Sequence, residues 1–136
     1  MGTGPFDVVV PSPLETVRSA IEPALKQHGF GILSEIDLAA TFQAKLGVEH
    51  EPHRILGVCK PQYAKHALDI DRDVALLLPC TITLRAVEGG TEVRVLDPNA
   101  AFTLASEGTR AQLEPLAGQV GAELAAAVAL LVATTS

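Results

Sequence analysis

The chain of 136 residues carries 10 Lys and Arg against 16 Asp and Glu, which gives a formal charge of −6 and a pI of about 5.1. Its basic residues are scattered, so it lacks the clustered positive charge of nucleic-acid-binding proteins, and no nucleic acid is expected as a partner. The size and the 48% hydrophobic content predict one core and a single α+β domain over residues 1–136.

Strands and helices alternate along the first half of the chain. Residues 6–10 form a β-branched run that predicts a strand. Apolar residues at helical spacing predict a helix from Leu14 to about His28, which the capping box Ser12-Pro13-Leu14-Glu15 begins and Gly29 ends. A second strand is predicted over residues 30–36. Asp37 is expected to cap a second helix, which ends at Gly47.

The middle of the chain predicts a short strand and helix followed by a hairpin. Residues 54–59 read as a strand, and Lys60-Pro61 begins a helix through Leu68. The run from Val74 to Val87 is the longest strand candidate, interrupted by Pro79 as a bulge or edge position. A turn at Gly89-Gly90 would return the chain over residues 93–95 and place Arg85 opposite Arg94.

The last predicted helix runs from Thr109 to Ala133. No charge follows Glu123, so its end is apolar nearly all round, and such a helix is usually buried on every side. We therefore expect a homodimer in which a second molecule covers the helix Thr109–Ala133. The element order is β-α-β-α-β-α-β-β-α, which predicts one sheet packed by helices.

No segment predicts a membrane or export signal. The apolar stretch from Leu124 to Ala133 is short for a bilayer, and no basic start or apolar stretch follows Met1. We expect no membrane partner and a cytoplasmic location. The two cysteines are then expected to be free thiols.

Four segments resemble one family, that of the domain of unknown function 302. They are Phe30–Asp37, then Ile55–Pro61 with Ala64, Ala67 and Leu68, then Leu77–Cys80, and finally Asp97-Pro98. The resemblance implies a curved, mainly antiparallel sheet packed by helices and related to the TATA-binding-protein fold. It implies no chemistry, because the family has no established activity. One residue departs from the pattern, since Lys60 stands where the family usually has Asn.

Cys59 and Cys80 are the leading candidates for a site, because each falls at a strand boundary beside a proline. Thiolates with an imidazole suit zinc or copper, but the spacing fits no standard zinc pattern. The alternative is that both cysteines are small hydrophobic residues of the core. We expect the two thiols to share a pocket.

Histidines offer a second, weaker set of candidates. His50 and His53 flank Glu51-Pro52 and could bind a metal ion or act as a base. The proline prevents a regular helix from presenting both rings on one face, so a solvated loop is the simpler interpretation. No metal ligand is otherwise indicated.

Three functions remain open at this point. The leading hypothesis is a homodimeric binding or sensing module for a small ligand or metal, with candidate binding residues Cys59, Pro61, His66, Pro79 and Cys80. A thiol-dependent enzyme would instead use Cys59 or Cys80 as nucleophile, with His53 or His66 as base. A structural or interaction domain would have no small-molecule site. The sequence identifies no cofactor, and it leaves open whether the chain is an enzyme.

Overall fold

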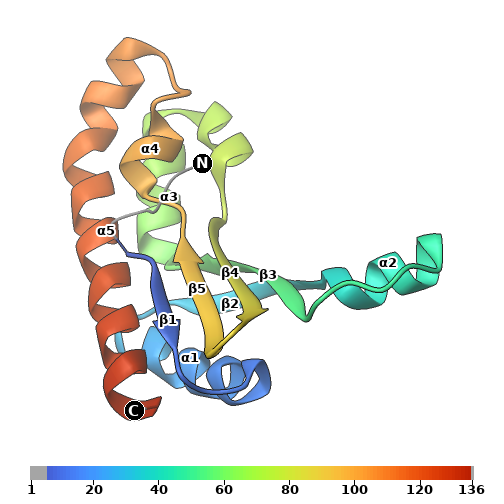
Figure 1. Ribbon diagram of the computed structural model, residues 1–136. Helices are drawn as coiled ribbons and strands as arrows, with labels where there is room; N and C mark the ends of the chain where they lie inside the picture. Colours follow the sequence, from blue (N-terminus) through green and yellow to red (C-terminus); the bar gives the residue numbers. More distant parts are fainter. Residues whose placement is uncertain (1–5, 136) are drawn as a thin grey trace.

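The computed structural model describes residues 6–135, which form one antiparallel sheet with helices packed on it (Figure 1). The five strands lie in the order β1-β5-β4-β3-β2. They are β1 (Val8–Val10), β2 (Gly31–Asp37), β3 (His53–Cys59), β4 (Cys80–Val87) and β5 (Gly90–Val95). The helices are α1 (Leu14–Gln27), α2 (Leu38–Leu46), α3 (Pro61–Ile70), the 3-10 helix η1 (Arg72–Leu77), α4 (Pro98–Phe102) and α5 (Glu107–Thr135). The α+β class and the predicted order of the main elements are confirmed, with η1 and α4 as additions.

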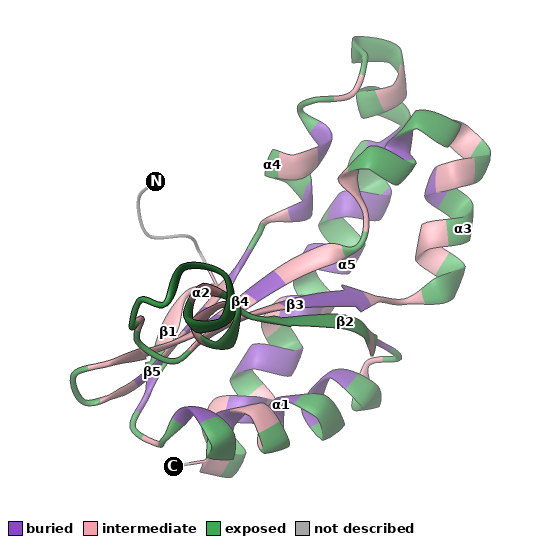
Figure 2. Cartoon of the chain, turned by 90° about the vertical axis from the view of Figure 1, so that its right-hand side faces the viewer, coloured by how far each residue is buried: buried purple, intermediate pink, exposed green. Residues whose placement is uncertain are grey.

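One face of the sheet is buried and the other is partly open. Along β4, Ile82 and Leu84 are buried, whereas Thr81 and Thr83 are only half-buried. This alternation is typical of a sheet with one face packed on the core. Helices α1 and α5 pack against each other and join the buried side of the sheet in a single hydrophobic cluster. Figure 2 shows this buried layer between the sheet and the helices.

Helix α5 is the longest element and supplies much of the core. It has 29 residues, among which Leu124 and Leu131 are completely buried. Its length and apolar composition would also fit a membrane span, a test that core helices pass as well. Its exposed positions near the C-terminal end are mainly alanines, including Ala126 and Ala129. Alanine has little apolar surface, so leaving it in water costs little free energy. The homodimer through Thr109–Ala133 stays a prediction.

The segment from Val74 to Leu78 was predicted as the first half of a long strand, and this prediction is wrong. It lies mostly in η1, where the Asp71 side chain accepts a hydrogen bond of 2.9 Å from the backbone N–H of Asp73. Val74 is buried but Leu76 is 88% exposed, so the run is not buried on both faces. A short apolar run does not by itself separate a strand from a helical turn.

The β4–β5 hairpin has a different register from the predicted one. Leu84 lies opposite Val93, and Arg85 lies opposite Glu92 rather than Arg94. The Arg85 and Glu92 side chains approach to 3.2 Å, so an ion pair replaces the expected repulsion. The shift is two residues, which leaves every side chain on its predicted face.

The two predicted helix caps have different outcomes. Pro13 rather than Ser12 precedes α1, and it makes no side-chain cap; the Ser12 hydroxyl instead donates to the carbonyl oxygen of Thr135 at 3.4 Å. The cap at Asp37 is confirmed, because its carboxylate accepts from the Ala40 N–H at 3.0 Å.

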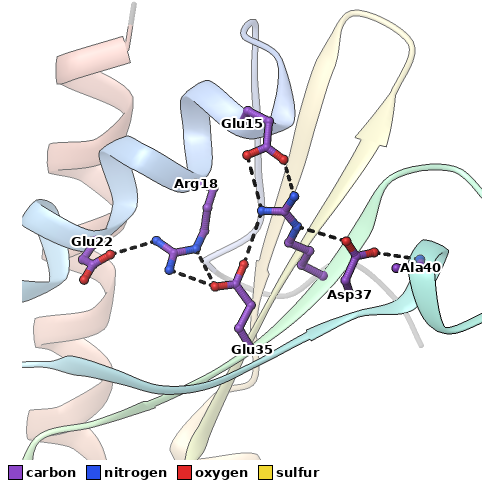
Figure 3. Close-up of polar contacts among 7 residues, drawn as sticks. Glu15, Arg18, Glu22, Glu35, Asp37 and Ala40 are labelled. Atoms are coloured by element: carbon purple, nitrogen blue, oxygen red, sulfur yellow. Dashed lines mark hydrogen bonds and ion pairs between the residues drawn. The ribbon is translucent and has the colours of Figure 1, made fainter.

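Ion pairs fasten α1 to the edge of the sheet (Figure 3). The Arg18 guanidinium of α1 reaches Glu35 of β2 at 2.8 Å and Glu22 at 3.0 Å. The hydrogen bond from Arg18 is the largest of the causes that hold the pKa of Glu35 below its usual value. The link joins a helix to the last strand of the sheet.

A second guanidinium extends this network toward α2. Arg54 of β3 pairs with Glu15 of α1 and lies 3.3 Å from Glu35 and 4.0 Å from Asp37. Asp37 also caps α2, so the network runs from α1 across β2 to the start of α2 (Figure 3). The acidic side chains at the sheet edge are therefore engaged within the chain.

Candidate functional site

The two cysteines come together at one end of the sheet. Cys59 is the last residue of β3 and Cys80 the first residue of β4, and these strands are antiparallel neighbours. The register places Cys80 directly opposite Val58, the residue before Cys59. Cross-strand neighbours of this kind are close enough for their side chains to interact. Both thiols line one cavity, as expected from their positions at the strand ends.

This cavity is small, apolar and formed by segments far apart in the sequence. Its volume is about 30 Å³, room for about two water molecules. The strands supply one wall, and α3, α4 and α5 supply the others. The lining residues are Phe30, Val58, Cys59, Lys60, Tyr63, Ala64, Ala67, Leu78, Cys80, Pro98, Phe102, Leu116 and Val120.

A cation lies at the rim of the cavity. The Lys60 ammonium donates to the Glu123 carboxylate at 2.9 Å, and the Tyr63 hydroxyl donates to the other oxygen of Glu123 at 3.1 Å. The same ammonium lies 4.6 Å from the centre of the Tyr63 ring and 5.9 Å from that of Phe30. Such distances allow cation–π attraction. The hydrogen bond to Glu123 is the main cause that raises the pKa of Lys60.

The cavity keeps its thiols protonated. Burial raises the pKa of Cys80 to about 11, and the neighbouring Cys59 adds to the increase. Burial also raises the pKa of Cys59. The cause is that an apolar environment disfavours the charged thiolate. At neutral pH the two side chains are neutral and behave as apolar wall residues.

The other three predicted site residues do not line the cavity. Pro61 is the exposed first residue of α3, and His66 is exposed on the same helix. Pro79 is exposed and covers Gly57 of β3, where an added Cβ would come within 2.7 Å of the Pro79 Cγ. The Ser34 hydroxyl lies closer still to that position, so Ser34 and Pro79 together require glycine at residue 57, and Pro61 starts α3. The structure gives each proline a position beside the cavity wall rather than in it.

The histidine pair lies at the opposite end of β3. His50 Nε2 and His53 Nδ1 are 3.2 Å apart, and their rings stack at 5.4 Å between centres. Burial, followed by the nearby His50, lowers the pKa of His53. Within residues 6–135, no three His, Cys, Asp or Glu side chains form a group able to hold a metal ion. Cys59 is six positions along β3 from His53, or about 20 Å, so the histidines and thiols form separate clusters.

The residues at the cavity rim were missed from the sequence. Lys60 was noticed only as a departure from a family pattern, and Glu123 only as the last charge of its helix. Sixty-three residues separate the two. A pattern of neighbouring residues cannot predict a contact between residues so far apart in the sequence. The isolated charge of Glu123, ahead of a long apolar stretch, was nevertheless a signal that it needs a partner.

Comparison with known proteins gives a family and a fold. The family model described as "Domain of unknown function DUF302" matches residues 6–131. A solved structure described as an uncharacterized conserved protein DUF302 from Bacillus stearothermophilus is similar, with 26% identity and a TM-score of 0.82. The similarity covers 94% of this chain and 99% of that one. No curated protein matches the chain.

Proposed function

Because the chain belongs to the DUF302 family, whose function is unknown, its role has to be inferred from the site, and we propose that it is a binding module for a small apolar molecule. The ligand would occupy the cavity beside Cys59 and Cys80. Small-molecule sites are typically concave, mostly apolar and fitted with a few polar groups. The cavity combines an apolar wall with the Lys60, Tyr63 and Glu123 rim.

The cavity must enlarge to admit a ligand. Its volume of about 30 Å³ is roughly tenfold smaller than that of an ordinary ligand pocket. Helix α3 is the wall best suited to move, because Ala67 is the only one of its ten described residues that is buried. Opening would separate Lys60 and Tyr63, at the start of α3, from Glu123 of α5. A ligand that replaces these contacts would compensate for their loss.

The thiols support binding better than nucleophilic catalysis. A nucleophilic cysteine normally has a pKa lowered by a nearby cation or a helix start. Burial instead raises the pKa of both Cys59 and Cys80. The exposed His66 lies outside the cavity lining, which leaves Cys80 without the expected base at that wall. A cytoplasmic location, where thiols stay reduced, is part of this proposal.

A thermal-shift experiment tests the binding proposal. Small apolar and amphipathic compounds, for example indole and octanoate, are added to the wild-type chain and the melting temperature is measured. A compound at 100 times its dissociation constant stabilises by about 2.7 kcal/mol, or roughly 10 °C for a domain of this size. Slower alkylation of Cys80 in the presence of the same compound would place it in the cavity.

Two matched variants, each with an alanine replaced by leucine, show where the compound binds. Ala64 lines the cavity, so Ala64→Leu should fill it and remove the thermal shift. Ala40 is exposed on α2, so Ala40→Leu should keep the shift. An absence of any shift across a broad panel, or an equal shift in both variants, would contradict binding in this cavity.

A further inference from the structure

The segment from Gly31 to Glu49, here termed the arm, contains a helix that lacks support from the rest of the chain. None of the nine residues of α2 is buried. Figure 1 shows this helix projecting from the body of the molecule, and Figure 2 shows it end-on in the colour of exposed residues. Helices shorter than about 12 residues are marginal in water without tertiary packing. Yet both ends are well defined, by the Asp37 cap and by Gly47 with a φ of +64°. The helix is specified by sequence but packs little on the rest of the chain, where the Phe42 ring meets the His50 ring edge-on at 5.0 Å between centres.

The arm also carries much of the exposed apolar surface. Among residues 6–135, eight large hydrophobic side chains are exposed, and four of them lie in the arm. These are Leu33, Ile36, Leu46 and Val48, with exposed fractions of 68%, 47%, 68% and 48%. None of the eight lies in α5. Half of the exposed large hydrophobic side chains thus lie in one segment, and exposed apolar surface is a feature of interaction surfaces.

The outer edge of β2 lies in the arm, and the strand pairing is irregular between Ile32 and Ser34. Strand β2 is the last in the sheet order, so no other strand within residues 6–135 pairs with its outer side. Edge strands commonly use charged side chains to prevent pairing with another chain. Here Glu35 and Asp37 are held by Arg18 and Arg54 (Figure 3). The apolar Leu33 and Ile36 remain exposed on this strand.

We propose that the arm is a self-association surface, which a second copy of this chain covers through the same residues. A two-fold axis beside β2 would bring the two β2 edges together in antiparallel orientation and place each α2 against the partner. The arm has 19 residues, just under the 20–30 that each side of a stable interface typically contributes. Its size is therefore close to that of one side of a stable interface.

Charge also favours a second copy of this acidic chain. Lys45 is the only charged residue between Leu38 and Val48, whereas the whole chain carries −6. The stretch from Leu38 to Val48 therefore carries one positive charge in an otherwise acidic chain, so it can pack against the acidic surface of a second copy without like-charge repulsion. This location replaces α5 as the proposed interface, because the exposed residues in the C-terminal part of α5 are mainly alanines.

Analytical ultracentrifugation of the full chain, with exposed-leucine variants, tests the proposal. Leu46→Glu places a charge on the arm, and Leu104→Glu makes the same change at a residue that is 80% exposed outside the arm. We expect the wild type and Leu104→Glu to be dimers at micromolar concentration. Leu46→Glu should weaken the dimer at least tenfold. Hydrogen exchange should show α2 amides that lose protection on dilution of the wild type.

Other outcomes would overturn the proposal. A wild-type chain that is monomeric at 100 μM would do so, as would a Leu46→Glu variant that dimerises like the wild type. Ala126→Glu adds a charge to the exposed side of α5. If that variant dissociates and Leu46→Glu does not, the interface lies on α5 and the arm is not involved. All of these changes are at exposed residues, so circular dichroism should show a folded chain in each.

Discussion

The cavity thiol Cys80 should be unusually slow to react, and the extent of this effect follows from its pKa. With a pKa of about 11, about one thiol in 10⁴ is ionised at pH 7. An ordinary thiol with a pKa of about 8.5 is about 3% ionised at that pH. Since only the thiolate attacks an alkylating agent, Cys80 should react about 300-fold more slowly than an unfolded thiol.

The measurement uses the Cys59→Ser variant, in which Cys80 is the only thiol. Its rate of reaction with iodoacetamide is followed by mass spectrometry between pH 7 and pH 10.5. The rate should rise about tenfold per pH unit with no plateau, because the thiol stays mostly protonated throughout. The same variant in urea is the control and should level off above about pH 8.5. A plateau below pH 9 in the folded variant would refute the argument that burial controls this thiol, and would revive the thiol enzyme.

Three further predictions concern stability. Because the raised pKa of Cys80 is lost on unfolding, the free energy of unfolding should fall by about 3 kcal/mol between about pH 8.5 and 11. Urea titrations should show that the free energy of unfolding falls more steeply with pH in the wild type than in Cys80→Ala. Equal slopes in the two proteins would contradict this prediction. Gly57→Ala should lower the free energy of unfolding by about 1–3 kcal/mol, because the added methyl group crowds Pro79. The control Gly118→Ala, at an open helical position, should raise it by about 0.5–1 kcal/mol. A Gly57→Ala variant as stable as the wild type would count against the close packing. The lowered pKa of Glu35 stabilises the fold above about pH 4.3, and this stabilisation is lost as the pH falls. In urea titrations, the free energy of unfolding of Glu35→Gln should therefore fall less steeply at acid pH than that of the wild type. An equally steep fall would show that the ion pair does not stabilise the fold.

The sequence predicted the elements whose signals are local. The helix cap at Asp37 and the end at Gly47 depend on residues three to ten positions apart, and both are found. The alternation along β4 likewise placed Ile82 and Leu84 in the core. These patterns are set by backbone geometry and by one buried face, so they do not need knowledge of distant contacts.

The failures occurred where a local pattern has two solutions. The apolar run before Pro79 fits a buried strand or a helical turn, and the capping of Asp73 by Asp71 selects the turn. The hairpin glycines allowed two registers that keep the same faces, and the Arg85–Glu92 ion pair accompanies the one found. In both cases polar side-chain contacts, rather than hydrophobic periodicity, distinguish the alternatives.

The candidate site could be predicted only in part for a related reason. Strand ends made Cys59 and Cys80 neighbours by topology, so their proximity was predictable from the order of elements. The rim depends on Lys60 meeting Glu123 of α5, which requires the packing of α3 against α5. The exposed state of α2 was equally hidden, because its apolar residues, spaced four apart, predict a buried face. In the self-association proposed above, a second copy would supply the surface that this spacing predicts.

The cavity and the arm can therefore be tested independently. The strand part of the arm begins beside the cavity, because Gly31 pairs with Cys59. Its helix α2 lies near the His53 end of β3, about 20 Å from Cys59 at strand spacing. Changes so far apart with no shared partner normally have additive effects. Leu46→Glu should thus leave the alkylation rate of Cys80 unchanged, and Ala64→Leu should leave association unchanged. If Leu46→Glu instead accelerates Cys80 alkylation, association at the arm and the closed state of the cavity are coupled through β3, and the chain is one switch rather than two separate surfaces.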